Sequence, residues 1–314
     1  MSTVNVGTMV GRSREVVEML ARRRVDICCV QEVRYKGVGT KTIGSDREKY
    51  KFWWSGNKTG RNGVGLLVRD EMVENVIEVK RTNDRIMKIK MVLGKKVVHV
   101  FSTYAPQAGR PEEEKQEFWE NLTDEVTEVP LSEGVLLGGD LNGHVGSERS
   151  GFEDVLGPFG IGERNREGET ILEFCQSQGL KIINTVFKKS REKLLTYKSG
   201  ETETQIDFIM MRRMENIREK DCTVIPGEAC LPQHRLLRLE LRVKGRRKMK
   251  KERVKRIKTW KLKDEDVRKE YSEKVSSYIE AKTGRLETLH EGMQRAAEEV
   301  CGVTSGRGHR ERET

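Results

Sequence analysis

The sequence predicts an α/β fold in which two mainly antiparallel sheets pack face to face and helices cover their outer surfaces. Short strand-like runs bounded by Gly, Pro, Asn or Asp recur throughout residues 1–243. Four of them, at 63–68, 73–79, 86–92 and 97–103, follow one another without a long helix, which favours antiparallel neighbours. About a dozen strands are accompanied by only three helices, which is typical of two packed sheets.

The elements of the first half of the chain follow from local patterns. Residues 3–6 predict a short strand, 14–23 carry apolar residues at helical spacing, and 25–30 form an apolar run typical of a buried strand. A helix is expected to begin at Pro111, because three glutamates follow it and acidic residues stabilise a helix N-terminus. Its apolar residues recur at the helical period and predict a face that packs on the core.

The second half of the chain adds one more helix, around 170–178, and a further series of strands. These strands are predicted at 134–137, 180–184, 194–197, 205–210, 222–225 and 236–243. Residues 260–300 predict a polar amphipathic helix, which cannot form a core by itself. We therefore expect one domain over 1–243, a basic linker over 244–258 and a helical tail over 259–314.

The net charge of +10 comes almost entirely from one block. Residues 244–258 contain ten Lys or Arg and one acidic residue, so the block carries +9 and the rest of the chain is close to neutral. Such a block is typical of a solvated linker, but it also fits binding to a phosphate backbone or a nuclear address. The sequence leaves these three interpretations open.

Cysteine usage and hydropathy indicate an intracellular protein. The six cysteines form no CxxC pair and no framework of a small disulfide-rich domain, so reduced and mostly buried thiols are expected. Residues 1–14 lack the apolar segment of a signal peptide, and no apolar run approaches the length of a membrane span. We expect no membrane partner, and a nuclear location if the basic block is an address.

Polar residues recur where the predicted strands end. The stretch 138–144 (Gly-Gly-Asp-Leu-Asn-Gly-His) follows the strand at 134–137 and carries Asp140 and Asn142. Because these two residues are two positions apart, both side chains point to the same side of an extended backbone. Gly, Asp and Asn are also common turn residues, so a plain turn is the alternative.

Other strand ends carry further candidates, namely Asn5, Glu32, Tyr104, Asp207 and His234. Asp207 lies between Ile206 and Phe208, so its side chain points away from theirs and needs a partner if it is buried. His234 is the natural partner, since a carboxylate fixes the tautomer of a catalytic imidazole.

Six motifs in this order resemble the endonuclease/exonuclease/phosphatase family. Within it, they are most similar to the apurinic-endonuclease-like domain of LINE retrotransposons of the RTE clade. The motifs are Asn5, Val30–Glu32, Ser102–Pro106, Gly138–Asn142, Gln205–Phe208 and Gln233–Leu236. The resemblance covers residues 1–243. The tail resembles the connector that precedes reverse transcriptase in those elements, and no reverse transcriptase domain is expected in this chain.

The resemblance implies a four-layered α/β sandwich and Mg²⁺-dependent hydrolysis of a phosphodiester in DNA, with Mn²⁺ as an alternative ion. Mg²⁺ prefers oxygen ligands and keeps several waters, so one or two carboxylates suffice to hold it. Glu32 is the expected direct ligand, with Asn5 beside it. The metal would neutralise charge on the phosphate and stabilise the leaving oxygen.

The same resemblance implies roles for the remaining candidates. Asp140 is expected to orient or deprotonate the attacking water, and Asn142 and Tyr104 to bind the phosphate or hold Asp140. His234, oriented by Asp207, is expected to contact a phosphoryl oxygen.

A loop over 160–165 could bring Arg164 and Asn165 to the substrate, with a plain loop as the alternative. A lone His144 after a turn is more often structural. The chain also departs from the family pattern: Gln233 stands where an Asp is usual, Gly7 where apurinic endonucleases have an acid, Val4 where Trp is usual, and Gln205 where Arg is common. We expect these changes to weaken metal binding.

Two classes of function remain open. The first is a metal-dependent DNA endonuclease that nicks duplex DNA or cuts at abasic sites. The second is a catalytically weak or inactive domesticated element that binds nucleic acid or chromatin, which Gln233 favours. The basic block does not separate them, because both bind phosphate. The sequence does not identify protein partners or the oligomeric state.

Overall fold

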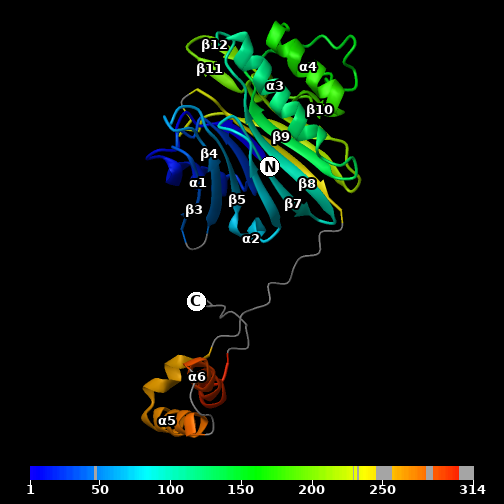
Figure 1. Cartoon of the computed structure of the whole chain (residues 1–314). Helices are drawn as coiled ribbons and strands as arrows, with labels where there is room; N and C mark the ends of the chain where they lie inside the picture. Colours follow the sequence, from blue (N-terminus) through cyan, green and yellow to red (C-terminus); the bar gives the residue numbers. More distant parts are fainter. Residues whose placement is uncertain (46–47, 229, 232, 245–256, 281–285, 304–314) are drawn as a thin grey trace, which may run out of the picture. The chain divides into compact units, whose positions relative to one another are not determined.

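The computed structural model describes residues 1–45, 48–228, 230–231, 233–244, 257–280 and 286–303 (Figure 1). The chain divides into two compact units, Met1–Arg247 and Lys248–Thr314. The basic block 244–258 lies mostly outside the described residues, so its three interpretations stay predictions.

Among the described residues, the first unit contains a seven-stranded and a six-stranded sheet. In the first sheet β1 and β2 run parallel, and the other neighbours run antiparallel. Its strands, in spatial order, are β14 (Ile217–Ile225), β15 (Leu236–Val243), β1 (Ser2–Asn5), β2 (Ile27–Gln31), β5 (Val64–Arg69), β4 (Lys49–Ser55) and β3 (Val38–Gly44).

The second sheet repeats this arrangement, with β8 and β9 as its parallel pair and antiparallel pairs elsewhere. In spatial order its strands are β10 (Leu180–Ile182), β13 (Asp207–Arg212), β9 (Gly134–Asp140), β8 (Lys96–Tyr104), β7 (Ile86–Leu93) and β6 (Val76–Arg81). A separate hairpin joins β11 (Tyr197–Ser199) and β12 (Thr202–Thr204).

Each parallel pair is joined by a helix that crosses over the outside of its sheet, as parallel strands require. Helix α1 (Ser13–Arg22) connects β1 to β2, and α3 (Glu112–Thr127) connects β8 to β9. Figure 1 shows α3 beside α4 (Arg166–Gln178) over the second sheet, and α1 on the first. The remaining helical turns of this unit are α2 (Asp70–Val73), η1 (Ile183–Thr185) and η2 (Arg191–Lys193).

The buried apolar residues of this unit form a core between the sheets and a core under the helices of each sheet. Ile89 and Leu237 belong to the core between the sheets. Leu122 and Phe208 lie in the core under α3 and α4, and Leu20 lies in the core under α1. Helix, sheet, sheet and helix therefore form four layers. The predicted sandwich of two mainly antiparallel sheets flanked by helices is confirmed.

The structure differs from the local predictions in several segments. The hairpin of β3 and β4 was not predicted. β3 is an edge strand rich in Thr, Lys and Gly and lacks an apolar run, whereas the aromatic run of β4 at 52–54 is a strand signal that the prediction missed. Within the predicted strand 73–79, α2 ends at Val73 and β6 begins at Val76. The predicted helix 260–300 is two helices, α5 (Glu265–Glu280) and α6 (Leu286–Cys301), preceded by η3 (Thr259–Lys263).

None of the helices in the described part of the chain is both long and apolar enough to span a membrane.

The close approach of β8 and β9 beside the candidate site depends on Gly139. A Cβ atom at Gly139 would lie 2.1 Å from Thr103 Oγ1 and 2.4 Å from the Thr103 carbonyl oxygen. Thr103 is fully buried, so its backbone cannot move away without separating the strands.

We expect Gly139→Ala to lower the free energy of unfolding by about 1–3 kcal/mol, the usual range for overpacking. Gly109→Ala is the matched control, because a Cβ there meets no atom within 4 Å. Equal urea midpoints for the two variants would contradict this account.

Candidate active site

The strand ends of both sheets bring the predicted site residues together. In the first sheet Asn5 pairs with Gln31 across parallel strands, so Glu32 follows directly beside it. In the second sheet Asp140 is flanked by Tyr104 on one side and Asp207 on the other. Because the sheets face each other, these side chains meet at one edge of the sandwich.

Asn5 connects the two sheets. Its amide nitrogen donates to Glu32 Oε1 at 2.9 Å and to Asp140 Oδ2 at 3.0 Å, and its oxygen accepts from the Gly7 backbone N–H at 2.9 Å. All of the polar capacity of the amide nitrogen is thus directed at two carboxylates from different sheets. Asn5 fixes the distance between those carboxylates.

Glu32 lies at the solvent side of this contact. Tyr104 donates its hydroxyl to Glu32 Oε1 at 2.9 Å, and Arg34 donates to Glu32 Oε2 at 2.7 Å. Burial raises the pKa of Glu32, but the hydrogen bonds from Asn5, Arg34 and Tyr104 outweigh it, so the net pKa lies below the ordinary value. Glu32 is therefore ionised at neutral pH and keeps an 18% exposed side chain.

Asp140 is almost completely buried at this edge. Its Oδ1 accepts from the backbone N–H of Asn142 at 3.2 Å, and its side chain is 2% exposed. Burial, and then the charge of Asp207, raise the pKa of Asp140 to about 7, although His234 and Asn5 oppose the shift. A carboxyl with this pKa can take up a proton near neutral pH.

Asp207 and His234 form a buried pair. His234 Nδ1 lies 3.0 Å from Asp207 Oδ2, while His234 Nε2 lies 3.7 Å from Asp140 Oδ2. Burial lowers the pKa of His234, but the charge and hydrogen bond of Asp207 and the charges of Asp140 and Glu32 together raise it more, and the result is about 9. The imidazole is thus positively charged at neutral pH and lies between two carboxylates. The ring of Tyr197 packs against it edge to face, with centroids 4.9 Å apart.

Asn142 braces the loop rather than pointing freely outward. It adopts a left-handed backbone conformation with φ of 50°, and its amide donates to the Ala105 carbonyl at 2.9 Å. These bonds join the loop after β8 to the loop after β9. The contact of Asn142 with Asp140 is made by its backbone N–H, and the roles expected for its side chain stay predictions.

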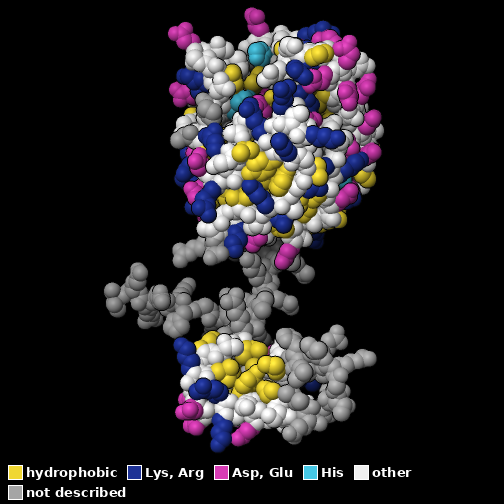
Figure 2. Space-filling view, turned by 60° about the vertical axis from the view of Figure 1, so that its left-hand side comes forward, with side chains coloured by type: hydrophobic (Ala, Val, Ile, Leu, Met, Phe, Trp, Pro, Cys, Tyr) yellow, Lys and Arg dark blue, Asp and Glu magenta, His cyan; other side chains and the backbone are white. Residues whose placement is uncertain are grey.

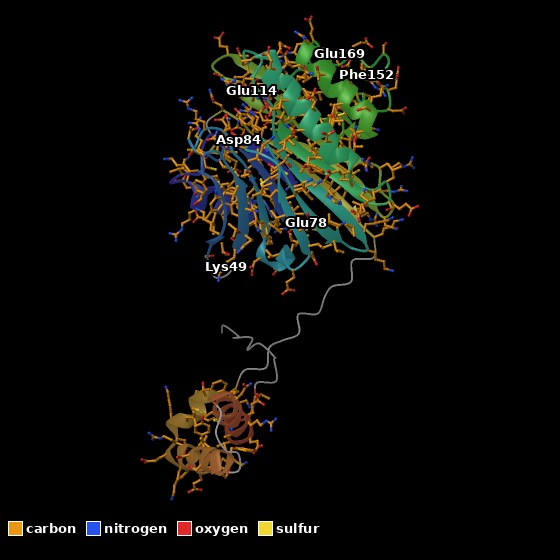
Figure 3. The ribbon with its side chains drawn as sticks, in the orientation of Figure 1. Lys49, Glu78, Asp84, Glu114, Phe152 and Glu169 are labelled. Carbon is orange, nitrogen blue, oxygen red and sulfur yellow. The ribbon has the colours of Figure 1, made fainter. Side chains whose placement is uncertain are left out.

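The loop residues Arg164 and Asn165 have structural partners. Asn165 is the N-cap of α4: its side-chain oxygen accepts from the backbone N–H groups of Gly168 and His144, both at 2.8 Å. Arg164 donates a hydrogen bond to Glu169 at 2.9 Å, and its guanidinium lies over the ring of Phe152. Figure 3 labels Glu169 and Phe152 near each other. Their substrate-binding roles stay predictions.

Sequence reasoning missed Arg34, Tyr197 and Thr196. Thr196 Oγ1 accepts from the backbone N–H of Asp207 at 3.0 Å and holds the start of β13. The sequence carries no signal for Arg34, since arginine on a loop is common. Gln233 is exposed, and its amide lies 3.4 Å from Ser199 Oγ on the β11–β12 hairpin.

The family model of the "Endonuclease/Exonuclease/phosphatase family" matches residues 2–162, more than half of the chain. The chain belongs to this family. Craniofacial development protein 2 from Bos taurus is 29% identical over 245 residues, which cover 77% of this chain and 40% of the relative. The protein of the same name from Tragulus javanicus is also 29% identical, with 42% of its length covered. The chain thus spans about 40% of the length of these relatives.

Solved structures of this fold include apurinic endonucleases. The Xenopus laevis APE2 catalytic domain has a TM-score of 0.56 at 14% identity, covering 77% of this chain and 93% of that one. AP endonuclease LMAP from Leishmania major has a TM-score of 0.52 at 11% identity, covering 77% and 87%. The endonuclease domain of TRAS1, a telomere-specific non-LTR retrotransposon, has a TM-score of 0.51 at 13% identity, covering 78% and 99%. At these identities the likeness shows the fold.

Family members generally depend on a divalent metal, and the oxygen-rich site of this chain fits one. Asp140, Asp207 and His234 present ligand atoms within 4.8 Å of one another. The imidazole of His234 is charged, however, so both of its nitrogens carry a proton and neither is free for a metal. The ionised and partly exposed carboxylate of Glu32 is better suited. Asn5 turns its nitrogen, not its oxygen, towards Glu32, so it acts here as a hydrogen-bond donor.

The charge of His234 gives a test of its pairing with Asp207. We expect Asp207→Asn to lower the pKa of His234 from about 9, because burial is then opposed only by the charges of Asp140 and Glu32. NMR titration of the imidazole, assigned with a His234→Gln variant, measures the shift. Asp154→Asn, a change of an exposed acid elsewhere, should leave that pKa in place. A pKa that stays near 9 in Asp207→Asn would refute the pairing.

The cap at Asn165 gives a second test. Asn165→Ala removes the acceptor for two backbone N–H groups and is expected to lower the free energy of unfolding by about 1 kcal/mol. Asn165→Asp keeps the acceptor and should preserve stability, since aspartate caps as well as asparagine. Thermal unfolding measures the stability of both variants. An equal loss of stability in both would argue against capping by Asn165.

Proposed function

We propose that this chain is a divalent-metal-dependent DNA endonuclease of the apurinic and retrotransposon type. The observation that carries the proposal is the position of Asp140, a buried carboxyl with a pKa of about 7 held between the Asn5 amide and the charged imidazole of His234. A base of this pKa beside a fixed cation suits attack of water on a phosphodiester.

The residues of the site can divide the reaction among them. Asp140 would take a proton from the attacking water while the oxygen of that water forms a bond to phosphorus. His234, charged and oriented by Asp207, would donate from Nε2 to a phosphoryl oxygen and stabilise its developing charge. Glu32 would hold Mg²⁺ or Mn²⁺, which when bound would neutralise the phosphate and stabilise the leaving oxygen.

Tyr104 would keep Glu32 in place rather than act as an acid. Burial, and then the charges of Glu32 and Asp140, raise the pKa of Tyr104 far above its ordinary value, so its hydroxyl keeps its proton and donates to Glu32. A fixed donor of this kind preorganises a carboxylate for metal binding.

The surface supports a polyanionic substrate. Lys and Arg side chains are numerous on the face of the first unit that Figure 2 shows. One structural neighbour, the 3′ phosphatase NExo from Neisseria, is bound to a product DNA hairpin, with a TM-score of 0.52 at 17% identity. Electrostatic attraction to phosphates would supply most of the affinity for duplex DNA. A nuclear location, with the block 244–258 as linker or address, fits this substrate.

The proposal predicts metal-dependent nicking by the full chain. Supercoiled plasmid and a duplex with one abasic site would be incubated with Mg²⁺ or with chelator. We expect Asp140→Asn and Glu32→Gln each to reduce cleavage about 100-fold or more, since general base catalysis and metal stabilisation each contribute at least that much. Glu78→Gln, on the exposed face of β6 (Figure 3), is the matched control and should cleave like the wild type.

Cleavage that persists in chelator, or that survives both site substitutions, would contradict the proposal. A folded wild-type chain that binds duplex DNA without cleaving it would replace the enzyme with a nucleic-acid-binding protein.

A further inference from the structure

The two oxygens of Glu32 have different surroundings. Oε1 faces the interior and accepts from both Asn5 and Tyr104 at 2.9 Å. Oε2 faces outward and accepts from Arg34 Nη2 at 2.7 Å. Because Oε1 has used both of its lone pairs, Oε2 is the Glu32 oxygen that retains acceptor capacity.

The backbone places Arg34 on that oxygen. Glu32 and Arg34 both adopt left-handed conformations, with φ of 52° and 54°, while Val33 between them is fully buried. Such conformations cost energy for residues other than glycine, so the surrounding structure must maintain them. The backbone N–H of Arg34 donates to the Asn62 carbonyl at 3.0 Å, and Val33 donates to Gly63 at 3.1 Å.

The partner loop is itself fixed. Asn57 and Asn62 donate to the same oxygen of Asp84, at 2.8 and 3.2 Å, and Gly63 donates its N–H to the Asp84 carbonyl. Asp84 is labelled in Figure 3. The fold therefore fixes the backbone positions of Arg34 and Glu32, from which their exposed ion pair forms.

We propose that Arg34 is a resident counter-ion of Glu32 that a divalent cation must displace, so that Arg34 sets the metal affinity of the site. Mg²⁺ binds its oxygen ligands at about 2.0–2.1 Å, so an ion held by Glu32 Oε2 would compete with the guanidinium for that oxygen. Two cations on one oxygen repel each other. The Arg34 side chain is 53% exposed and can leave towards solvent when the metal arrives. The inference rests on the proposed function in one respect, that Glu32 holds the metal.

Metal binding, measured apart from catalysis, tests this inference. The free Mn²⁺ signal in electron paramagnetic resonance gives the Kd for the full chain without DNA. We expect Arg34→Ala and Arg34→Gln to bind Mn²⁺ about tenfold more tightly than the wild type, because the competing charge is gone. Arg61→Ala is the matched control: it removes the same charge from an exposed arginine without an ion pair among the described residues, and its Kd should equal that of the wild type. Glu32→Gln locates the site and should lose binding.

Each other outcome is decisive. An unchanged or higher Kd in both folded Arg34 variants, with binding lost in Glu32→Gln, would overturn the role of Arg34 and leave the proposed function standing. Tighter binding in Arg61→Ala as well would reduce the effect to overall charge and would also overturn it. If Glu32→Gln binds Mn²⁺ with the affinity of the wild type, Glu32 does not hold the metal, and both proposals fail together.

Discussion

Two buried carboxylates on neighbouring strands impose the constraint on which the rest of the site depends. Asp140 and Asp207 lie directly opposite each other in β9 and β13, and neither has more than a trace of solvent contact. Two like charges so close cannot both stay ionised without compensation. His234 supplies a positive charge between them, and Asn5 supplies a donor from the other sheet. The proton balance of the site follows from this arrangement.

Compensation from two sheets requires that the sheets approach closely at this edge. A Cβ atom on Gly138 would come within 3.0 Å of Thr3 and 3.1 Å of Cys29, so glycine lets β9 lie near the opposing sheet. Gly139 likewise lets β9 lie close to its neighbour β8. The two glycines before Asp140 therefore allow close packing of β9, and Asp140 itself carries the carboxylate of the candidate site. One short stretch of β9 performs both tasks.

Strained backbone is concentrated around the same edge. Glu32, Arg34 and Asn142 all have positive φ, and each places a polar side chain at the site or against its supports. Strain of this kind is kept only where the surrounding hydrogen bonds determine the conformation. Here the bonds from the 57–63 loop and the Ala105 carbonyl provide that support. The site is preorganised by its neighbours and not by its own conformational preferences.

The sequence by itself determined the two-sheet fold and the acids at its strand ends, because period-two patterns and polar residues after apolar runs are local signals. Alternation also indicated that Asp207 points away from its apolar neighbours and needs a partner if it is buried. Only the tertiary structure decided that the amide nitrogen of Asn5 donates to Glu32 and Asp140. It also decided that Asn165 caps α4 and that Arg34 forms an ion pair with Glu32. β3 was likewise decided by its pairing with β4, since its own residues carry no apolar period. These features depend on contacts between segments far apart in the chain, and local patterns hold no information on such contacts.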